Sequence, residues 1–194
     1  MAKDIIVIDI ETKNSFADVG GQGNLKDLDC SLIGLYSYNF DKYMAFREDK
    51  INEVGPILQN AGLIIGFSIT RFDLPVLNKY YNFNLLSLPR VDLLDEIETA
   101  YGRRIGLDLL AKANLGYGKT GHGLDAIEYY KKGDWDSLEK YCLMDVKVTR
   151  LVYEYACLHG KVKYQDRTGK CVEIPLAIAP PSSVRPALNL SLPL

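Results

Sequence analysis

The chain has 194 residues, of which 47% are hydrophobic and 25% charged, and its formal net charge at pH 7 is −2. This length and composition fit one globular domain with a sizeable core, and the charge excludes a protein that binds nucleic acid through bulk positive charge. Apolar runs such as residues 5–10 are too short to cross a bilayer and the N-terminus lacks a secretory signal, so we expect a cytoplasmic protein without membrane contacts.

The N-terminal half is predicted to hold the strands of the main sheet. The expected strands are apolar, β-branched or aromatic runs bounded by turn residues, and they cover residues 4–10, 31–40, 43–46, 63–67 and 91–94. The first three follow one another closely, with a turn near residues 39–42, and therefore predict an antiparallel meander. A helix that is weakened by Pro56 should begin near Asp49, and a short helix is expected over residues 73–81.

The C-terminal half is predicted to be helical. Apolar spacing indicates helices over residues 107–113, 124–131 and 136–159, and Asp134 or Asp136 can cap the start of the last one. A hairpin is expected over residues 161–175.

Strands followed by strands that alternate with helices predict an α/β fold with a mixed sheet. We expect one domain over residues 1–175 and an irregular, proline-rich tail over residues 176–194. The cysteines, which lack the CxxC spacing of a zinc site, are expected to be buried free thiols. They are Cys30, Cys142, Cys157 and Cys171.

Two acidic residues stand at the end of the first predicted strand. Asp9 and Glu11 are two residues apart, so both side chains should point to one face of the sheet. An acidic pair on a core face or in a cleft is costly unless a cation neutralises it. Acidic residues are also common where a strand emerges into solvent, so the pair alone leaves both interpretations open.

Further acidic residues are unremarkable when each is taken alone. Tyr141 and Asp145 are four residues apart in the last predicted helix and lie on one of its faces, which is common for a surface pair. Asp73 precedes Leu74 and Pro75, as a helix N-cap residue would.

Three segments combine these residues in one order along the chain. They are DIET at residues 9–12, GFSITRFDLPVL at residues 66–77 and YCLMDVKVT at residues 141–149. Together they resemble the DEDD exonuclease superfamily. The tyrosine four residues before the last acid is similar to its DEDDy branch, which includes proofreading domains of DNA polymerases and stand-alone bacterial ribonuclease H-like proteins. Three motifs in sequence are a strong signal where each alone is weak.

The resemblance covers roughly residues 4–175 and extends to residues 106–116, to Lys119 and to the turn at residues 133–135. The sequence departs from the family at Ser68, where the middle motif usually carries asparagine. A serine hydroxyl can replace part of the hydrogen bonding of that amide, but it is shorter. The departure bears on how substrate is positioned.

The resemblance implies a ribonuclease H-like fold and a two-metal-ion 3′-5′ exonuclease that releases nucleoside 5′-monophosphates from DNA or RNA. It implies two Mg²⁺ or Mn²⁺ ions, which prefer carboxylate oxygens, with Asp9 bridging both. Glu11 and Asp145 would complete the site that activates the attacking water, and Asp73 would serve the second ion. Tyr141 would orient that water through its hydroxyl.

Substrate contacts are expected from residues near the motifs, by stacking on an aromatic ring or by binding phosphate. These residues are Thr12, Phe16, Ser68 and Arg71. Core packing is expected instead for Phe67 and Phe72. Lys112 is expected to be solvated, and His122 to be a loop residue. The implied partner is a single strand of nucleic acid with a free 3′ end, and a helicase or polymerase partner follows by analogy only.

Two alternatives stay open. One is a nucleic-acid-binding module of the same fold whose chemistry has decayed, although all four acids and the tyrosine are retained. The other is an endonuclease that uses the same metal site. The sequence does not distinguish DNA from RNA substrates, and it does not fix the oligomeric state.

Overall fold

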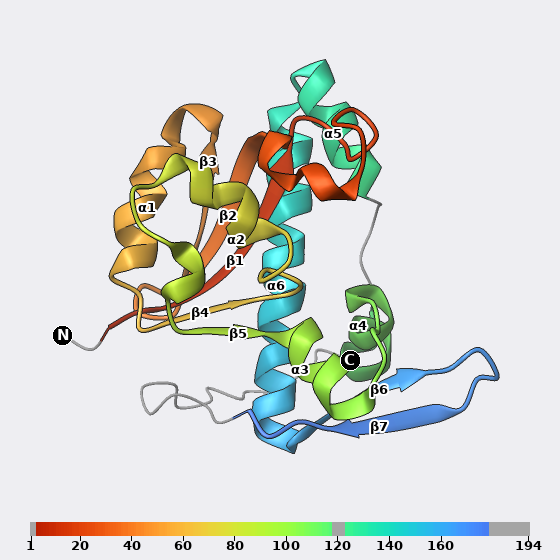
Figure 1. The fold of residues 1–194 in the computed structure, drawn as a ribbon. Coiled ribbons are helices and arrows are strands. Elements are labelled where there is room, and N and C mark those ends of the chain that lie inside the picture. Colours follow the sequence, from red (N-terminus) through yellow and green to blue (C-terminus); the bar gives the residue numbers. More distant parts are fainter. Residues whose placement is uncertain (1–2, 118–122, 179–194) are drawn as a thin grey trace.

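The computed structural model describes residues 3–117 and 123–178. A five-stranded sheet in the order β3-β2-β1-β4-β5 has helices packed on both faces, and a separate hairpin lies beside it (Figure 1). The five strands are β1 (Ile5–Thr12), β2 (Cys30–Ser37), β3 (Lys42–Arg47), β4 (Leu63–Gly66) and β5 (Arg90–Asp92). The strands β1, β2 and β3 form an antiparallel meander, whereas β4 and β5 run parallel to β1. The mixed sheet and its meander are those predicted from the sequence.

The helices connect and cover this sheet. They are α1 (Ile51–Gln59), α2 (Asp73–Leu77), α3 (Leu93–Tyr101), α4 (Leu107–Leu115), α5 (Gly123–Lys132) and α6 (Trp135–His159). Short 3-10 helices cover residues Gln22–Asp27, Glu48–Lys50, Asn78–Tyr80 and Leu85–Ser87. The hairpin strands β6 (Lys161–Gln165) and β7 (Cys171–Pro175) follow α6 and occupy the segment where a hairpin was predicted. No helix within the described ranges is long and apolar enough to cross a membrane.

The strand β1 is buried on both faces because its apolar side chains alternate between two cores. Ile6, Ile8 and Ile10 belong to the core that includes α1 and α2. Ile5 and Val7 belong to the opposite core, which includes α3, α4 and α6. The same alternation assigns the next odd-numbered side chains of β1, Asp9 and Glu11, to the α6 face.

Helix α6 packs closely on β2 beside β1. Gly34 of β2 provides the room, since a Cβ atom there would lie 2.7 Å from Cys142 Sγ and 3.0 Å from Val146 Cγ2. Asp134 caps the helix by accepting a hydrogen bond from the Ser137 N–H at 3.1 Å. Gly160 ends it at a φ of +63°, in the left-handed region that favours glycine. Both ends were expected from the sequence.

Several local predictions were wrong. Residues 91–94 do not form one strand, because β5 ends at Asp92 and the unpredicted helix α3 begins at Leu93. The Asp92 side chain accepts a hydrogen bond from the Leu94 N–H at 3.0 Å and so caps α3. The strand expected to reach residue 40 ends at Ser37, where a turn with Asp41 at a φ of +46° begins.

Two of the four cysteines are not buried. All are free, and Cys30 and Cys142 lie in the core, but Cys157 is half-buried and Cys171 is exposed on β7. A strand of a two-stranded hairpin has one face open to solvent, which explains the exposure of Cys171. Leu176 and Ile178 pack against the core that includes α6. Lys119, His122 and residues 179–194 of the expected tail lie outside the described residues.

Candidate active site

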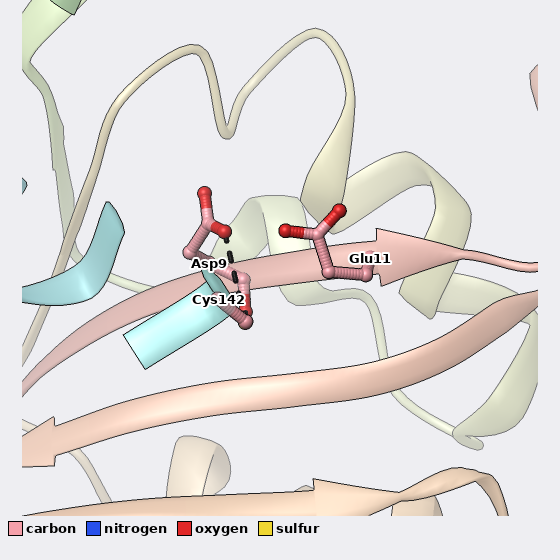
Figure 2. A group of neighbouring side chains, drawn as sticks. All are labelled: Asp9, Glu11 and Cys142. Atoms are coloured by element: carbon pink, nitrogen blue, oxygen red, sulfur yellow. Dashed lines mark hydrogen bonds between the residues drawn. The ribbon is translucent and has the colours of Figure 1, made fainter. Parts of the chain in front are cut away.

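The end of β1 presents two carboxylates on one side of the strand. Figure 2 shows the side chains of Asp9 and Glu11 projecting from β1 in the same direction. Glu11 is 8% exposed and Asp9 is half-buried. The β1–β2 register pairs Asp9 with Gly34 and shifts between Glu11 and Thr12. The spacing-based prediction that the two acids share a face is therefore confirmed, and the face is the one that α6 covers.

Helix α6 contributes the next group of side chains. The Cys142 thiol donates to the Asp9 carbonyl oxygen at 3.6 Å and to Asp9 Oδ2 at 3.7 Å (Figure 2). The ligand atoms of Asp9, Glu11 and Cys142 all lie within 4.8 Å of one another. Burial and the charges of Asp9 and Glu11 raise the pKa of the Cys142 thiol well above its usual range. Cys142 therefore contributes a neutral thiol donor beside two acceptors.

Asp73 enters the site from the first residue of α2. Its Oδ1 accepts a hydrogen bond from the Ile10 N–H at 3.1 Å, which ties the start of α2 to β1. The pKa of Asp73 is raised to about 7, mainly by burial; backbone N–H groups lower it, and the charges of Asp92 and Asp145 raise it. Asp73 thus titrates near neutral pH in a crowded acidic environment.

Tyr141 and Asp145 lie one turn apart on α6, as their spacing predicts. Burial raises the pKa of Tyr141, and the nearby charges of Asp145, Glu11 and Asp9 raise it further. The phenol consequently keeps its proton at neutral pH and can donate a hydrogen bond. Asp145 is only 5% exposed, which is unusual for an aspartate and expected where an acid serves a site.

A cleft of about 540 Å³ joins these elements. Nine residues were predicted from the sequence to bind metal or substrate or to orient the attacking water. Eight of them line this cleft, the exception being Thr12. The acids and the tyrosine in its lining are Asp9, Glu11, Asp73, Asp145 and Tyr141. The remaining lining residues are Ile10, Phe16, Gln22, Leu25, Phe67, Ser68, Arg71, Phe72 and Arg104. The cleft therefore combines a strongly acidic wall with aromatic, apolar and cationic side chains.

Two of the expected substrate contacts have other partners. Thr12 is 7% exposed, and its hydroxyl donates to the Asn14 carbonyl at 2.8 Å. Arg71 lines the cleft, but its guanidinium pairs with Glu98 at 2.6 Å and with Asp95 at 3.4 Å.

The aromatic side chains have mixed surroundings. Phe16 and Phe72 are in edge-to-face contact with ring centroids 5.7 Å apart, and both line the cleft. Both also pack against the core that includes α1 and α2. Phe67 packs on the opposite core and borders the cleft as well. Each ring therefore has a packing role, as expected for Phe67 and Phe72, and also faces the space where a ligand would lie.

The sequence reasoning missed Asp92 and Arg104. Asp92 Oδ1 accepts from the Ser68 N–H at 2.7 Å, and Oδ2 accepts from the Thr70 N–H at 2.8 Å, so this buried acid holds the loop that follows β4. An aspartate ahead of the helical spacing of Leu93, Leu94 and Ile97 was the available signal for a helix cap. No local signal marks Arg104, which reaches the cleft from the segment between α3 and α4.

The donor set fits a hard divalent cation. Carboxylate oxygens are the ligands that Mg²⁺ and Mn²⁺ prefer, and four carboxylates line this cleft. Burial is the main cause of the raised pKa of Asp73, and the charge of Asp145 adds to it, which is negative charge that a bound cation would offset. The sulfur of Cys142 is a softer ligand than these ions prefer, which favours its role as a donor to Asp9.

The sequence matches a family model described as the RNase_H superfamily over residues 7–157. Among solved structures, the fold is similar to that of the family B DNA polymerase from the hyperthermophilic archaeon Pyrobaculum calidifontis, with a TM-score of 0.59 and 14% sequence identity. The similarity covers 81% of this chain, which spans 26% of the polymerase chain. At this identity the likeness concerns the fold alone. No curated protein matches the sequence at a significant level.

Proposed function

The chain belongs to the RNase_H superfamily, and we propose that it is a metal-dependent 3′-5′ exonuclease of the DEDDy type. Its substrate is a single strand of DNA or RNA, from which it releases nucleoside 5′-monophosphates. The superfamily and the fold indicate a nuclease, and hence a nucleic-acid substrate. The observation that carries the finer proposal is the convergence of four carboxylates and Tyr141, from β1, α2 and α6, on one cleft.

Asp9, Glu11, Asp73 and Asp145 would hold two divalent ions, Mg²⁺ or Mn²⁺. Such ions, when bound, supply a hydroxide nucleophile at neutral pH and offset negative charge on the leaving oxygen. The protein holds Asp73 through the Ile10 N–H, and it holds Asp9 beside the Cys142 thiol. These contacts limit the rotamers of two proposed ligands before substrate arrives.

Tyr141 is proposed to orient the attacking water. Its pKa is raised by burial and by the neighbouring acids, so the hydroxyl stays protonated and can donate. Phe16 and Phe72 border the same space and present ring faces or edges on which a terminal base could stack.

The direct test is cleavage of 5′-labelled single-stranded DNA and RNA in Mg²⁺, Mn²⁺ or chelator. We expect a ladder that shortens from the 3′ end in either ion, with mononucleotides carrying a 5′-phosphate. Asp9→Asn and Asp145→Asn, which keep side-chain size, should abolish the ladder while the folded domain persists. Glu53→Ala is the matched control, because it removes an exposed acid on α1 that does not line the cleft.

Three results that differ from these expectations would each count against part of the proposal. Internal cuts would favour an endonuclease that uses the same acids. Binding of the oligonucleotide without cleavage in either ion would favour a module whose chemistry has decayed. Equal activity of Asp145→Asn and Glu53→Ala would contradict the assignment of the acidic residues.

A further inference from the structure

Two arginines line the cleft in the described part of the chain, and they differ in how their charges are compensated. Arg71 lies between two acids of α3, with its Nη2 2.6 Å from Glu98 Oε2 and its Nε 3.4 Å from Asp95 Oδ1. One guanidinium there faces two carboxylates. Arg71 therefore adds no net positive charge to its surroundings.

Arg104 has a different contact. It is exposed in the segment between α3 and α4, and its Nη2 donates to Ser68 Oγ at 3.3 Å. That partner is neutral. Among the ion pairs formed within the described residues, none involves Arg104. Within the described residues its positive charge is therefore not compensated by an ion pair, and Arg104 lines the same cleft as the four acids.

The backbone at Ser68 is held in an uncommon conformation. Its φ is +67°, in the left-handed region, which costs a residue other than glycine about 1–2 kcal/mol. Asp92 stabilises this turn through the N–H groups of Ser68 and Thr70. Strain that is held in place by a buried acid and lies on a cleft wall is typical of a functional position. The turn leaves the Ser68 hydroxyl within reach of Arg104.

We propose that Arg104 and Ser68 form a phosphate subsite that binds the backbone of the nucleic-acid strand in this cleft. A guanidinium has five N–H donors, and one of them is used on Ser68. The Ser68 oxygen accepts that bond, so its own hydrogen can be donated to the same phosphate. The subsite offers a polyanion one strong attraction beside an acidic wall. The proposal rests on the proposed nucleic-acid substrate, but not on hydrolysis.

Binding, rather than cleavage, gives the decisive test. The full chain is titrated onto a fluorescein-labelled single-stranded oligodeoxynucleotide in Ca²⁺, with gels to show that the strand stays intact, at several salt concentrations. Removing a charge-assisted hydrogen bond in Arg104→Ala should weaken binding about tenfold to a hundredfold. The slope of log affinity against log salt should shrink by about 0.7, the value for one phosphate contact on a single strand.

Matched variants separate charge from geometry. Arg104→Lys should keep most of the salt slope but lose part of the affinity, because an ammonium cannot bind phosphate bidentately. Arg103→Ala removes the same charge from an exposed neighbour that does not line the cleft, and its affinity should stay close to wild type. Thermal melting of each variant should match that of wild type.

Two results would overturn the phosphate subsite, and a third would support it while contradicting the proposed nuclease activity. Equal affinity and equal slope for Arg104→Ala and Arg103→Ala would overturn the phosphate subsite, whatever the protein cleaves. Failure of the wild type to bind any strand would overturn it too. Wild-type binding that depends on Arg104, without cleavage in Mg²⁺ or Mn²⁺, would support the subsite while contradicting the proposed nuclease activity.

Discussion

Replacing Asp73 by asparagine should make the metal-free protein more stable than wild type at pH 8, but much less so at pH 5. The substitution keeps the oxygen that accepts from the Ile10 N–H at 3.1 Å and removes the negative charge. Asp73 is 4% exposed, and burial is the main cause of its raised pKa. The charge of Asp145 adds to this effect. The ionised carboxylate therefore weakens the folded state, and asparagine cannot ionise.

The sign and size follow from proton linkage. Asp73 has a pKa of about 7 in the folded protein, against 3.8 when unperturbed, so the folded state binds more protons between these values. The stability that protonated Asp73 contributes is fully present below pH 3.8 and is lost as pH rises through about 7. At 1.36 kcal/mol per pH unit, the loss reaches about 4 kcal/mol over the whole range and about 3 kcal/mol between pH 5 and pH 8.

Urea unfolding in chelator, followed by circular dichroism at pH 5 and pH 8, measures this difference. The free energy of unfolding of Asp73→Asn minus that of wild type should rise by about 3 kcal/mol between the two pH values. Groups that titrate independently of Asp73 cancel in the subtraction. A difference that is the same at both pH values would show that Asp73 is ionised at both. The argument that burial and neighbouring charges raise its pKa would then fail.

Other parts of the site give further predictions. Tyr141→Phe should lower turnover by about tenfold to a thousandfold with unchanged melting, as single-turnover assays would show; unchanged turnover would mean that the ring only packs. Gly34→Ala should cost about 1–3 kcal/mol in urea unfolding, and adding Cys142→Ala should recover part of it, since the clash involves Cys142 Sγ. Mn²⁺ or Mg²⁺ should raise the melting temperature of wild type by several degrees but barely change Asp9→Ala; equal shifts would locate the ions elsewhere.

The sequence was most informative where geometry repeats over a few residues. A two-residue period placed Asp9 and Glu11 on one face of β1, and a four-residue spacing placed Tyr141 and Asp145 on one face of α6. The order of three motifs then indicated a ribonuclease H-like fold. Neither spacing indicates that α6 lies against the acidic face of β1. That depends on Gly34, whose missing side chain leaves room for Cys142 Sγ.

The start of α3 was harder to predict because one residue serves several elements. Asp92 ends β5, caps α3 and holds the N–H groups of Ser68 and Thr70. Residues 91–94 are apolar apart from this acid, so a short buried strand and a helix start give the same local pattern. The hydrogen bond that caps α3, from the Leu94 N–H to Asp92, is local, but the bonds from Ser68 and Thr70 that also engage Asp92 join residues more than 20 positions apart, as the Ser68–Asp92 pair does at a separation of 24.

The missed helix α3 also affects which of the two cleft arginines is predicted to bind phosphate. Arg71 lies within the middle motif, beside Asp73, and its position in the sequence favours a role in binding phosphate. Its charge is compensated because α3, a helix absent from the predicted elements, presents Asp95 and Glu98 to it. Arg104 lies outside the motif, yet the end of α3 brings it back to Ser68.

If the proposed subsite is correct, a prediction that omits α3 assigns the phosphate contact to the wrong arginine. The salt dependence of binding by Arg104→Ala, compared with that of Arg71→Ala, would distinguish the two arginines. Loss of Arg71 would leave Asp95 and Glu98 without their cation, so its effect should appear in stability as well as in binding, whereas the effect of Arg104→Ala should be confined to binding.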